Sequence, residues 1–258
     1  MRLMKRILSA ATVLALSASL LVGCSSGTAS SVPVSASSAA ESTVSSVEET
    51  ASSAVDENEA AAAQLLNDLT GSYQELWPVI LADEYKQTWL DDCTVLVGEE
   101  NAEAAFEKLS SMVTSDVYGE DAVEAYANGG GAYFCGFTNS LATLTFDGET
   151  STISGTDKDG NVLFSHTYHY IGMEPVHGLY EFESDDADSG EFTYFFLAPD
   201  TSAETYHIEF RYGSDAEALS QYDAGEYAYW VASGISTDCD QTMIDNCIEL
   251  FCTENLAG

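Results

Sequence analysis

Glu204-Thr-Tyr-His-Ile-Glu-Phe-Arg-Tyr212 alternates apolar and polar side chains over almost its whole length. Successive side chains of a β-strand point to opposite faces, so the stretch predicts a strand with one apolar face. That face carries Tyr206, Ile208, Phe210 and Tyr212. The opposite face carries Thr205, His207, Glu209 and Arg211. A strand of this kind belongs to a sheet that buries one side.

The same period of two recurs upstream of this stretch. Further strands are predicted near 132–138, 141–147, 150–155, 162–171, 178–184 and 191–198. Asp147-Gly148 and Asp159-Gly160 are typical hairpin turns between such strands. Consecutive strands joined by short turns favour an antiparallel meander that closes into a small barrel.

Helical spacing occurs on both sides of the strands. Residues 59–69, 73–92 and 101–113 are predicted to be helices. A last helix is expected to start after a cap at Thr237 or Asp238 and to reach about Cys252. On this helix Cys247 falls on an apolar face, which favours a buried, inert thiol. The predicted fold class is therefore α+β.

The N-terminus has the pattern of an export signal. A basic start is followed by an apolar run from Ile7 to Val22. Leu21-Val22-Gly23-Cys24 resembles the lipobox of bacterial lipoproteins, and this resemblance implies lipidation of Cys24. We therefore expect a lipoprotein signal peptide over 1–23 and an extracytoplasmic chain anchored to the cell envelope membrane by Cys24. An ordinary signal peptide with an incidental cysteine is the alternative.

A low-complexity segment follows the signal. Residues 25–58 are mostly Ser, Ala, Thr, Val and Glu and contain no aromatic side chain. Such a stretch cannot bury enough apolar surface to offset its ordering entropy. We expect a disordered tether over 24–58 and one folded domain over 59–258.

The charge and the motifs exclude several functions. The 258 residues include 7 Lys and Arg against 43 Asp and Glu, a formal charge of −36. Nucleic acid is excluded as a partner, because its phosphates must be neutralised by basic side chains. No Ser/His/Asp motif, zinc-protease motif or phosphate-binding loop is present, so we expect no enzyme. Without Cys24 five cysteines remain, so at least one of them stays unpaired within the chain.

Three blocks of the sequence resemble the ZinT (YodA) family of extracytoplasmic zinc-binding proteins. They are Gly71-Ser-Tyr-Gln-Glu-Leu-Trp-Pro78; Tyr168-x-Tyr170-x-Gly172 with Gly178-Leu-Tyr-Glu-Phe182 and Glu191-Phe-Thr-Tyr-Phe-Phe-Leu-Ala-Pro199; and His207-x-Glu209-x-x-x-Gly213. The resemblance spans about residues 65–254. It implies a calycin-like β-barrel with N-terminal helices and a C-terminal helix.

The resemblance also implies a zinc site, which this chain carries in altered form. The family binds zinc through a His shortly before the Ala-Pro step and through a His-x-His pair on the next strand. Here Phe195 stands where the first His belongs, and the pair aligns as His207 and Glu209. Zinc accepts one imidazole and one carboxylate. The expected metal ligands are therefore His207 and Glu209, with His166 as the nearest third candidate by strand neighbourhood.

Two non-enzymatic functions follow. The first is a lipid-anchored protein that binds zinc or another divalent metal with a degenerate ligand set, and passes it to an unidentified transport partner. The alternative is a calycin-like binding module that has lost the metal and binds a small molecule or a protein partner. The non-functional alternative for this stretch is that His207, Glu209 and Arg211 form a solvated strand face with an internal ion pair.

Overall fold

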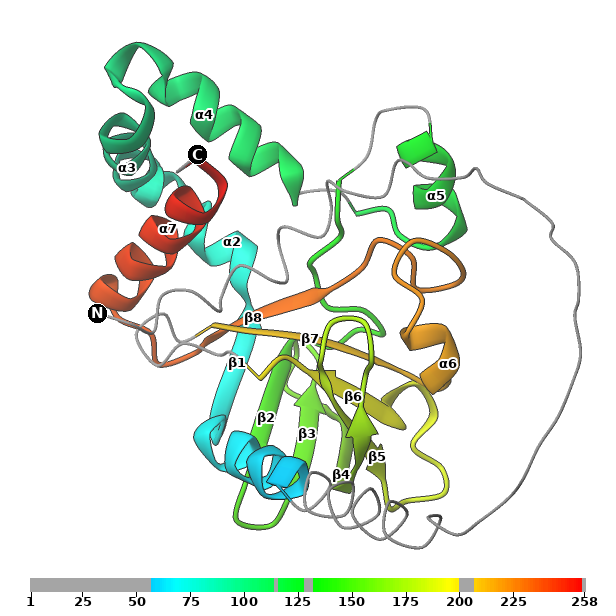
Figure 1. Ribbon diagram of the computed structural model, residues 1–258. Helices are drawn as coiled ribbons and strands as arrows, with labels where there is room; N and C mark the ends of the chain where they lie inside the picture. Colours follow the sequence, from blue (N-terminus) through cyan, green and yellow to red (C-terminus); the bar gives the residue numbers. More distant parts are fainter. Residues whose placement is uncertain (1–56, 114–115, 128–131, 200–206, 257–258) are drawn as a thin grey trace, which may run out of the picture. The chain divides into compact units, whose positions relative to one another are not determined.

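The fold is built around a closed β-barrel (Figure 1). The computed structural model describes residues 57–113, 116–127, 132–199 and 207–256. Within these ranges eight strands follow one another around the barrel in sequence order, and all neighbouring strands are antiparallel. The first strand also pairs with the last, which closes the ring. The predicted calycin-like barrel with helices before and after it is confirmed.

The strands match most of the predicted segments. They are β1 (Gly71–Glu75), β2 (Thr143–Asp147), β3 (Thr152–Thr156), β4 (Val162–Met173), β5 (Tyr180–Ser184), β6 (Tyr194–Leu197), β7 (His207–Gly213) and β8 (Ala232–Ser236). The two Asp-Gly pairs lie between β2 and β3 and between β3 and β4, as expected. Gly148 is required at its turn, because an added Cβ would lie 2.4 Å from the Asn67 backbone.

The helices lie before, between and after the strands. A helix over 57–68 precedes β1. The others are α2 (Leu76–Ile80), α3 (Lys86–Val97), α4 (Glu99–Met112), α5 (Glu120–Ala127), α6 (Ala216–Leu219) and α7 (Gln241–Leu256), with short 3-10 turns at Asp83–Tyr85 and Gly190–Phe192. The cap predicted for α7 is wrong. Asp240 caps it, since its Oδ1 accepts a hydrogen bond from the Met243 backbone N–H at 3.0 Å.

Three predictions about strands are also wrong. Residues 71–75 form β1 although the surrounding spacing is helical, and the Tyr73 ring packs into the barrel against Phe146. Segment 132–138 is not a strand and makes a single bridge between Phe134 and Trp230. The pattern also misses β8, whose residues are mostly small. Small residues suit this strand because an added Cβ at Gly234 would lie 3.1 Å from the Ile208 side chain.

The barrel wall separates two apolar cores. The interior is filled mainly by large aromatic side chains, among them Phe146, Phe164, Phe182, Phe195, Phe210, Tyr212 and Trp230. Each fully buried Phe contributes roughly 1.5–3 kcal/mol to stability. The second core lies outside the barrel, where α2, α3, α4 and α7 pack together and reach Ile235 of β8. Figure 1 shows α3, α4 and α7 gathered on one side of the barrel.

Candidate functional site

His207 and Glu209 lie on the outer face of the barrel wall. They share one face of β7, as the alternation predicts, because the apolar residues of β7 fill the barrel interior. His207 lies opposite Ile235 of β8 in the strand pairing. The His207 ring also contacts the Phe251 ring of α7, with centroids 5.8 Å apart. Helix α7 therefore covers this end of β7.

Burial holds the His207 imidazole in its neutral form. It lowers the pKa of His207 from 6.5 to about 4, because the charged ring would lose its hydration beneath the helix. A neutral imidazole is the form that coordinates metal ions. At neutral pH His207 is therefore a competent ligand that needs no deprotonation step.

The shift at His207 predicts a loss of stability in acid. The folded chain resists protonation of His207 while the unfolded chain accepts it, so stability falls as the pH drops from about 6.5 to about 4. We expect about 2 kcal/mol of this loss to come from His207. Urea unfolding across this range, in metal-free buffer, measures it. His207→Gln should flatten the profile; identical profiles for wild type and His207→Gln would contradict the assignment.

Two thiols lie in the same region as Glu209. Cys135 and Cys247 are both buried. Burial raises the pKa of Cys135 to about 12, and the negative charge of Glu209 raises it further. Burial also raises the pKa of Cys247, with smaller contributions that include Glu209. Because the thiolate is the metal-binding form, these protonated thiols add no ready ligand.

His166, the predicted third ligand, lies on the other side of the barrel wall. It is on the inner face of β4, opposite Ile153 of β3, which belongs to the barrel interior. Its Nδ1 is 2.7 Å from a carboxylate oxygen of Asp186. His169 lies on the outer face, with its Nδ1 2.8 Å from Asp185. The structure does not bring His166 to the β7 pair.

The described residues therefore provide two donors at this place. Among them, no group of three or more His, Cys, Asp or Glu side chains is arranged to hold a metal ion. Zinc sites in proteins use three or four protein ligands. His207 and Glu209 fit one edge of a zinc coordination sphere and do not make a complete one.

Phe195 is the residue that the ZinT-like resemblance aligns with a family histidine. Its ring is fully buried in the barrel interior, with centroids 5.4 Å from those of Tyr168 and Tyr212. It therefore faces away from His207 and Glu209, which lie outside the wall. The sequence alignment places these three positions in one site, but the barrel wall separates Phe195 from the other two.

Arg211 is the third polar residue on this face of β7, and it is completely buried. The interpretation of a solvated strand face is therefore wrong for Arg211, whereas His207 and Glu209 are half-buried. The guanidinium donates hydrogen bonds to the backbone carbonyls of Leu219, Gln221 and Tyr227. Its Cζ lies 4.2 Å from the centroid of the Tyr222 ring. Arg211 thus fastens the segment between β7 and β8 to the barrel.

A buried carboxylate lies in the loop that precedes β5, and its electrostatic effect on Arg211 is smaller than that of Tyr222. Glu174, in the loop between β4 and β5, is 0% exposed and accepts hydrogen bonds from the backbone N–H groups of Val176 and His177. The His177 ring packs on Tyr222 at 3.7 Å between centroids. Burial lowers the pKa of Arg211, and the charge of Glu174 opposes this shift. No sequence pattern connects Arg211 with Glu174 and Tyr222. The one signal in the sequence is the basic residue Arg211 on a strand face, and the structure shows that this residue is covered.

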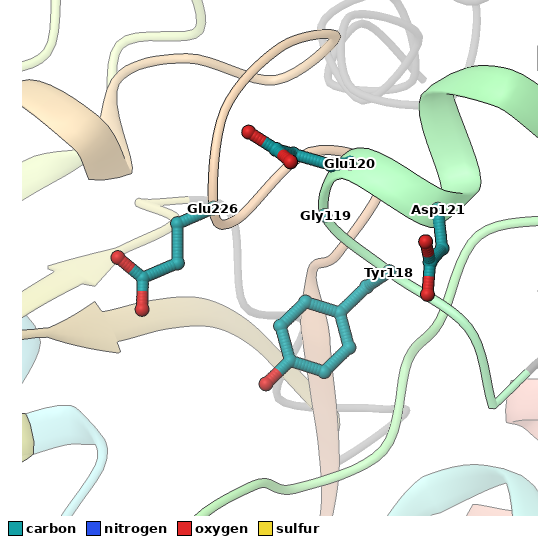
Figure 2. Close-up of a pocket in the computed structure, with 5 residues that line it drawn as sticks. All are labelled: Tyr118, Gly119, Glu120, Asp121 and Glu226. Atoms are coloured by element: carbon teal, nitrogen blue, oxygen red, sulfur yellow. The ribbon is translucent and has the colours of Figure 1, made fainter.

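An open acidic pocket lies elsewhere, at the start of α5. It has a volume of about 430 Å³ and is lined by Tyr118, Gly119, Glu120, Asp121 and Glu226. Figure 2 shows that its three carboxylates point in different directions and do not converge on one point. The pocket therefore has the charge of a cation site without its geometry.

The predicted membrane anchor cannot be followed in the structure. Cys24, the signal peptide 1–23 and the tether 24–58 lie outside the described residues, except for 57 and 58, which begin the first helix. Over the described ranges, no helix is both long enough and apolar enough to span a membrane.

Comparison with known proteins finds similar solved structures, including the following two. No family model matches the chain, and no curated protein matches it. The zinc-bound ZinT-like domain of AdcA from Streptococcus pneumoniae is 15% identical, with a TM-score of 0.45, over 71% of this chain and 89% of that domain. Zinc-bound AdcA from the same organism is 14% identical, with a TM-score of 0.42, over 72% of this chain and 35% of AdcA. Similarities of this size assign neither a family nor a ligand.

Proposed function

We propose that this chain is a lipid-anchored, extracytoplasmic protein that binds a divalent metal, zinc first of all, and that it has no catalytic activity. The observation that carries the proposal is the pair formed by His207 and Glu209. The two side chains share the outer face of β7, and the imidazole is held neutral beneath α7. An imidazole and a carboxylate two residues apart on a strand suit zinc.

The number of metal-donor side chains determines whether zinc would be bound permanently or reversibly. A structural zinc site is closed by four protein ligands, whereas the described residues offer two here. We therefore expect reversible capture, completed by ligands from outside this pair, and not a resident structural ion. When bound, zinc would add a positive charge beside Glu209; the chain itself supplies only the two donors and the covering helix.

The surroundings of the domain agree with capture outside the cytoplasm. The lipobox-like Leu21-Val22-Gly23-Cys24 supports anchoring through lipidated Cys24, and the tether would separate the domain from the membrane. A charge of −36 concentrates cations near the surface and repels nucleic acid. It does not select one metal, so selectivity has to come from His207 and Glu209.

Zinc titration of the purified full chain by calorimetry tests the proposal. We expect one saturable site with a Kd below ~1 μM. His207→Ala and Glu209→Gln should each weaken binding by about tenfold or more, because each removes one of two donors. His169→Ala is the matched control and should leave binding unchanged, since His169 lies apart and pairs with Asp185. Binding that is no tighter than to a generic acidic protein would exclude the metal function.

A metal-free binding module is the second candidate. It is favoured by Phe195, an aromatic side chain where the family pattern has a ligand, and by the two-donor limit at His207 and Glu209. The aromatic filling of the barrel leaves the outer surface for a small molecule or a protein partner. This candidate requires the zinc titration to fail and a ligand to raise the melting temperature of the chain.

A further inference from the structure

Two buried thiols meet where α3 packs against α7. Cys93 belongs to α3 and Cys252 to α7, and both are 0% exposed. Their Sγ atoms lie 3.9 Å apart. Figure 1 shows α3 and α7 side by side, and the two helices are in contact along this interface. Across the described ranges no second sulfur–sulfur contact accompanies this one.

The separation is close to that of a bonded pair. A disulfide has a sulfur–sulfur length of about 2.05 Å, so the two atoms must approach by roughly 2 Å. Each Sγ is one rotatable bond from its Cα atom, so rotation about the Cα–Cβ bonds is the movement by which the two sulfurs would approach. The other described cysteines, Cys135, Cys239 and Cys247, offer no comparable pair.

We propose that Cys93 and Cys252 form a redox site that closes to a disulfide when the chain meets a thiol oxidant. The oxidant is a disulfide, either that of a dithiol oxidase or a small-molecule disulfide such as oxidised glutathione. Two S–H bonds break and one S–S bond forms by thiol–disulfide exchange. Two electrons pass to the oxidant, whose disulfide is reduced to two thiols that take up the two protons. The proposal goes beyond metal binding and does not depend on it.

The bond would join distant parts of the chain. The two cysteines are 159 positions apart, so the closed loop contains most of the domain. A long loop gives a large loss of disorder in the unfolded chain, which is the main source of disulfide stabilisation. The bond would also fix α7, whose Phe251 contacts His207. Oxidation would thus hold the helix that covers the His207–Glu209 pair.

Burial controls when the bond can form. It raises the pKa of both thiols, most strongly that of Cys252, so little of the reactive thiolate exists in the folded chain. We therefore expect slow oxidation of the folded protein and faster oxidation during refolding. A newly exported, still unfolded chain would be the substrate that an oxidant meets.

The test uses the full chain carrying Cys24→Ser, which leaves five thiols. The protein is unfolded, refolded in oxidised and reduced glutathione, and digested without reduction for mass spectrometry. We expect a peptide linked through Cys93 and Cys252, three thiols that react with Ellman's reagent after unfolding in denaturant, and a melting temperature about 5–10 °C higher. Dithiothreitol should reverse the gain.

Controls separate the pair from a general effect of oxidation. Cys93→Ser and Cys252→Ser should each abolish the linked peptide, whereas Cys247→Ser, on the same helix, should retain it. The linked peptide is sought in the protein that retains both Cys93 and Cys252. The test therefore still gives a result if one of the serine variants does not fold. The absence of the linked peptide after refolding, or a bond between another pair, overturns the proposal. Zinc titration of the oxidised and reduced forms reports separately on the metal function.

Discussion

Replacing Arg211 by methionine is expected to lower the free energy of unfolding by about 3–5 kcal/mol. The side chain is completely buried and donates hydrogen bonds to three backbone carbonyls in the segment between β7 and β8. Methionine fills similar volume but leaves those carbonyls without their donor. It also removes a positive charge that acts on the buried carboxylate of Glu174, which itself lies 3.5 Å from His177 Nδ1. Urea unfolding followed by tryptophan fluorescence measures the loss.

Two further variants identify the source of this loss. Arg211→Lys keeps the charge but replaces the planar fork by a single ammonium group, so we expect an intermediate loss of about 2 kcal/mol. Glu174→Gln combined with Arg211→Met should cost less than the sum of the two single changes, because each single change removes the same electrostatic interaction. A loss below about 1 kcal/mol in Arg211→Met would show that solvent or another group replaces the guanidinium.

Replacing Phe195 by alanine is expected to cost about 3–5 kcal/mol, because it opens a cavity in the centre of the barrel. The rings of Phe164, Tyr168 and Tyr212 pack around Phe195 and cannot all collapse into the space. Phe195→Leu keeps much of the volume and should cost about 1.5 kcal/mol. Urea unfolding with a constant m-value measures both; a loss for alanine no greater than for leucine would contradict the described packing.

Phe195 also tests the placement of the metal ligands. Phe195→His restores the histidine of the family pattern, but on the inner side of the wall, away from His207 and Glu209. We therefore expect no gain in zinc affinity by calorimetry, together with a loss of stability from burying a polar ring without a partner. A tighter zinc site in this variant would mean that the three positions do share one site.

The strand pattern predicted the barrel where strands are long or strictly alternating. Residues 162–171 and 204–212 show the period clearly, and two Asp-Gly turns mark the hairpins. The pattern fails for β1 and β8. The five residues of β1 run directly into α2, so helical spacing dominates the window. The small residues of β8 carry little apolar signal, and at Gly234 the size is limited by Ile208 on the neighbouring strand β7.

The same limits apply to the candidate site. Alternation within one strand correctly predicted that His207 and Glu209 share a face. Alternation does not show which face of one strand lies on the same side of the sheet as a given face of another strand. His166 could therefore not be excluded as a neighbour of His207 and Glu209. It also cannot show that α7 covers His207, because that contact joins segments that are distant in the sequence.

The pairing of β1 with β8 has a consequence for how the chain reaches its final form. These strands stand at opposite ends of the barrel sequence, so the ring cannot be completed until nearly the whole domain is present. Such high contact order slows folding, and until β8 arrives both β1 and β7 expose unpaired backbone groups. The vulnerable form of this protein is therefore the incomplete ring, whose two open edges can pair with another molecule before they find each other.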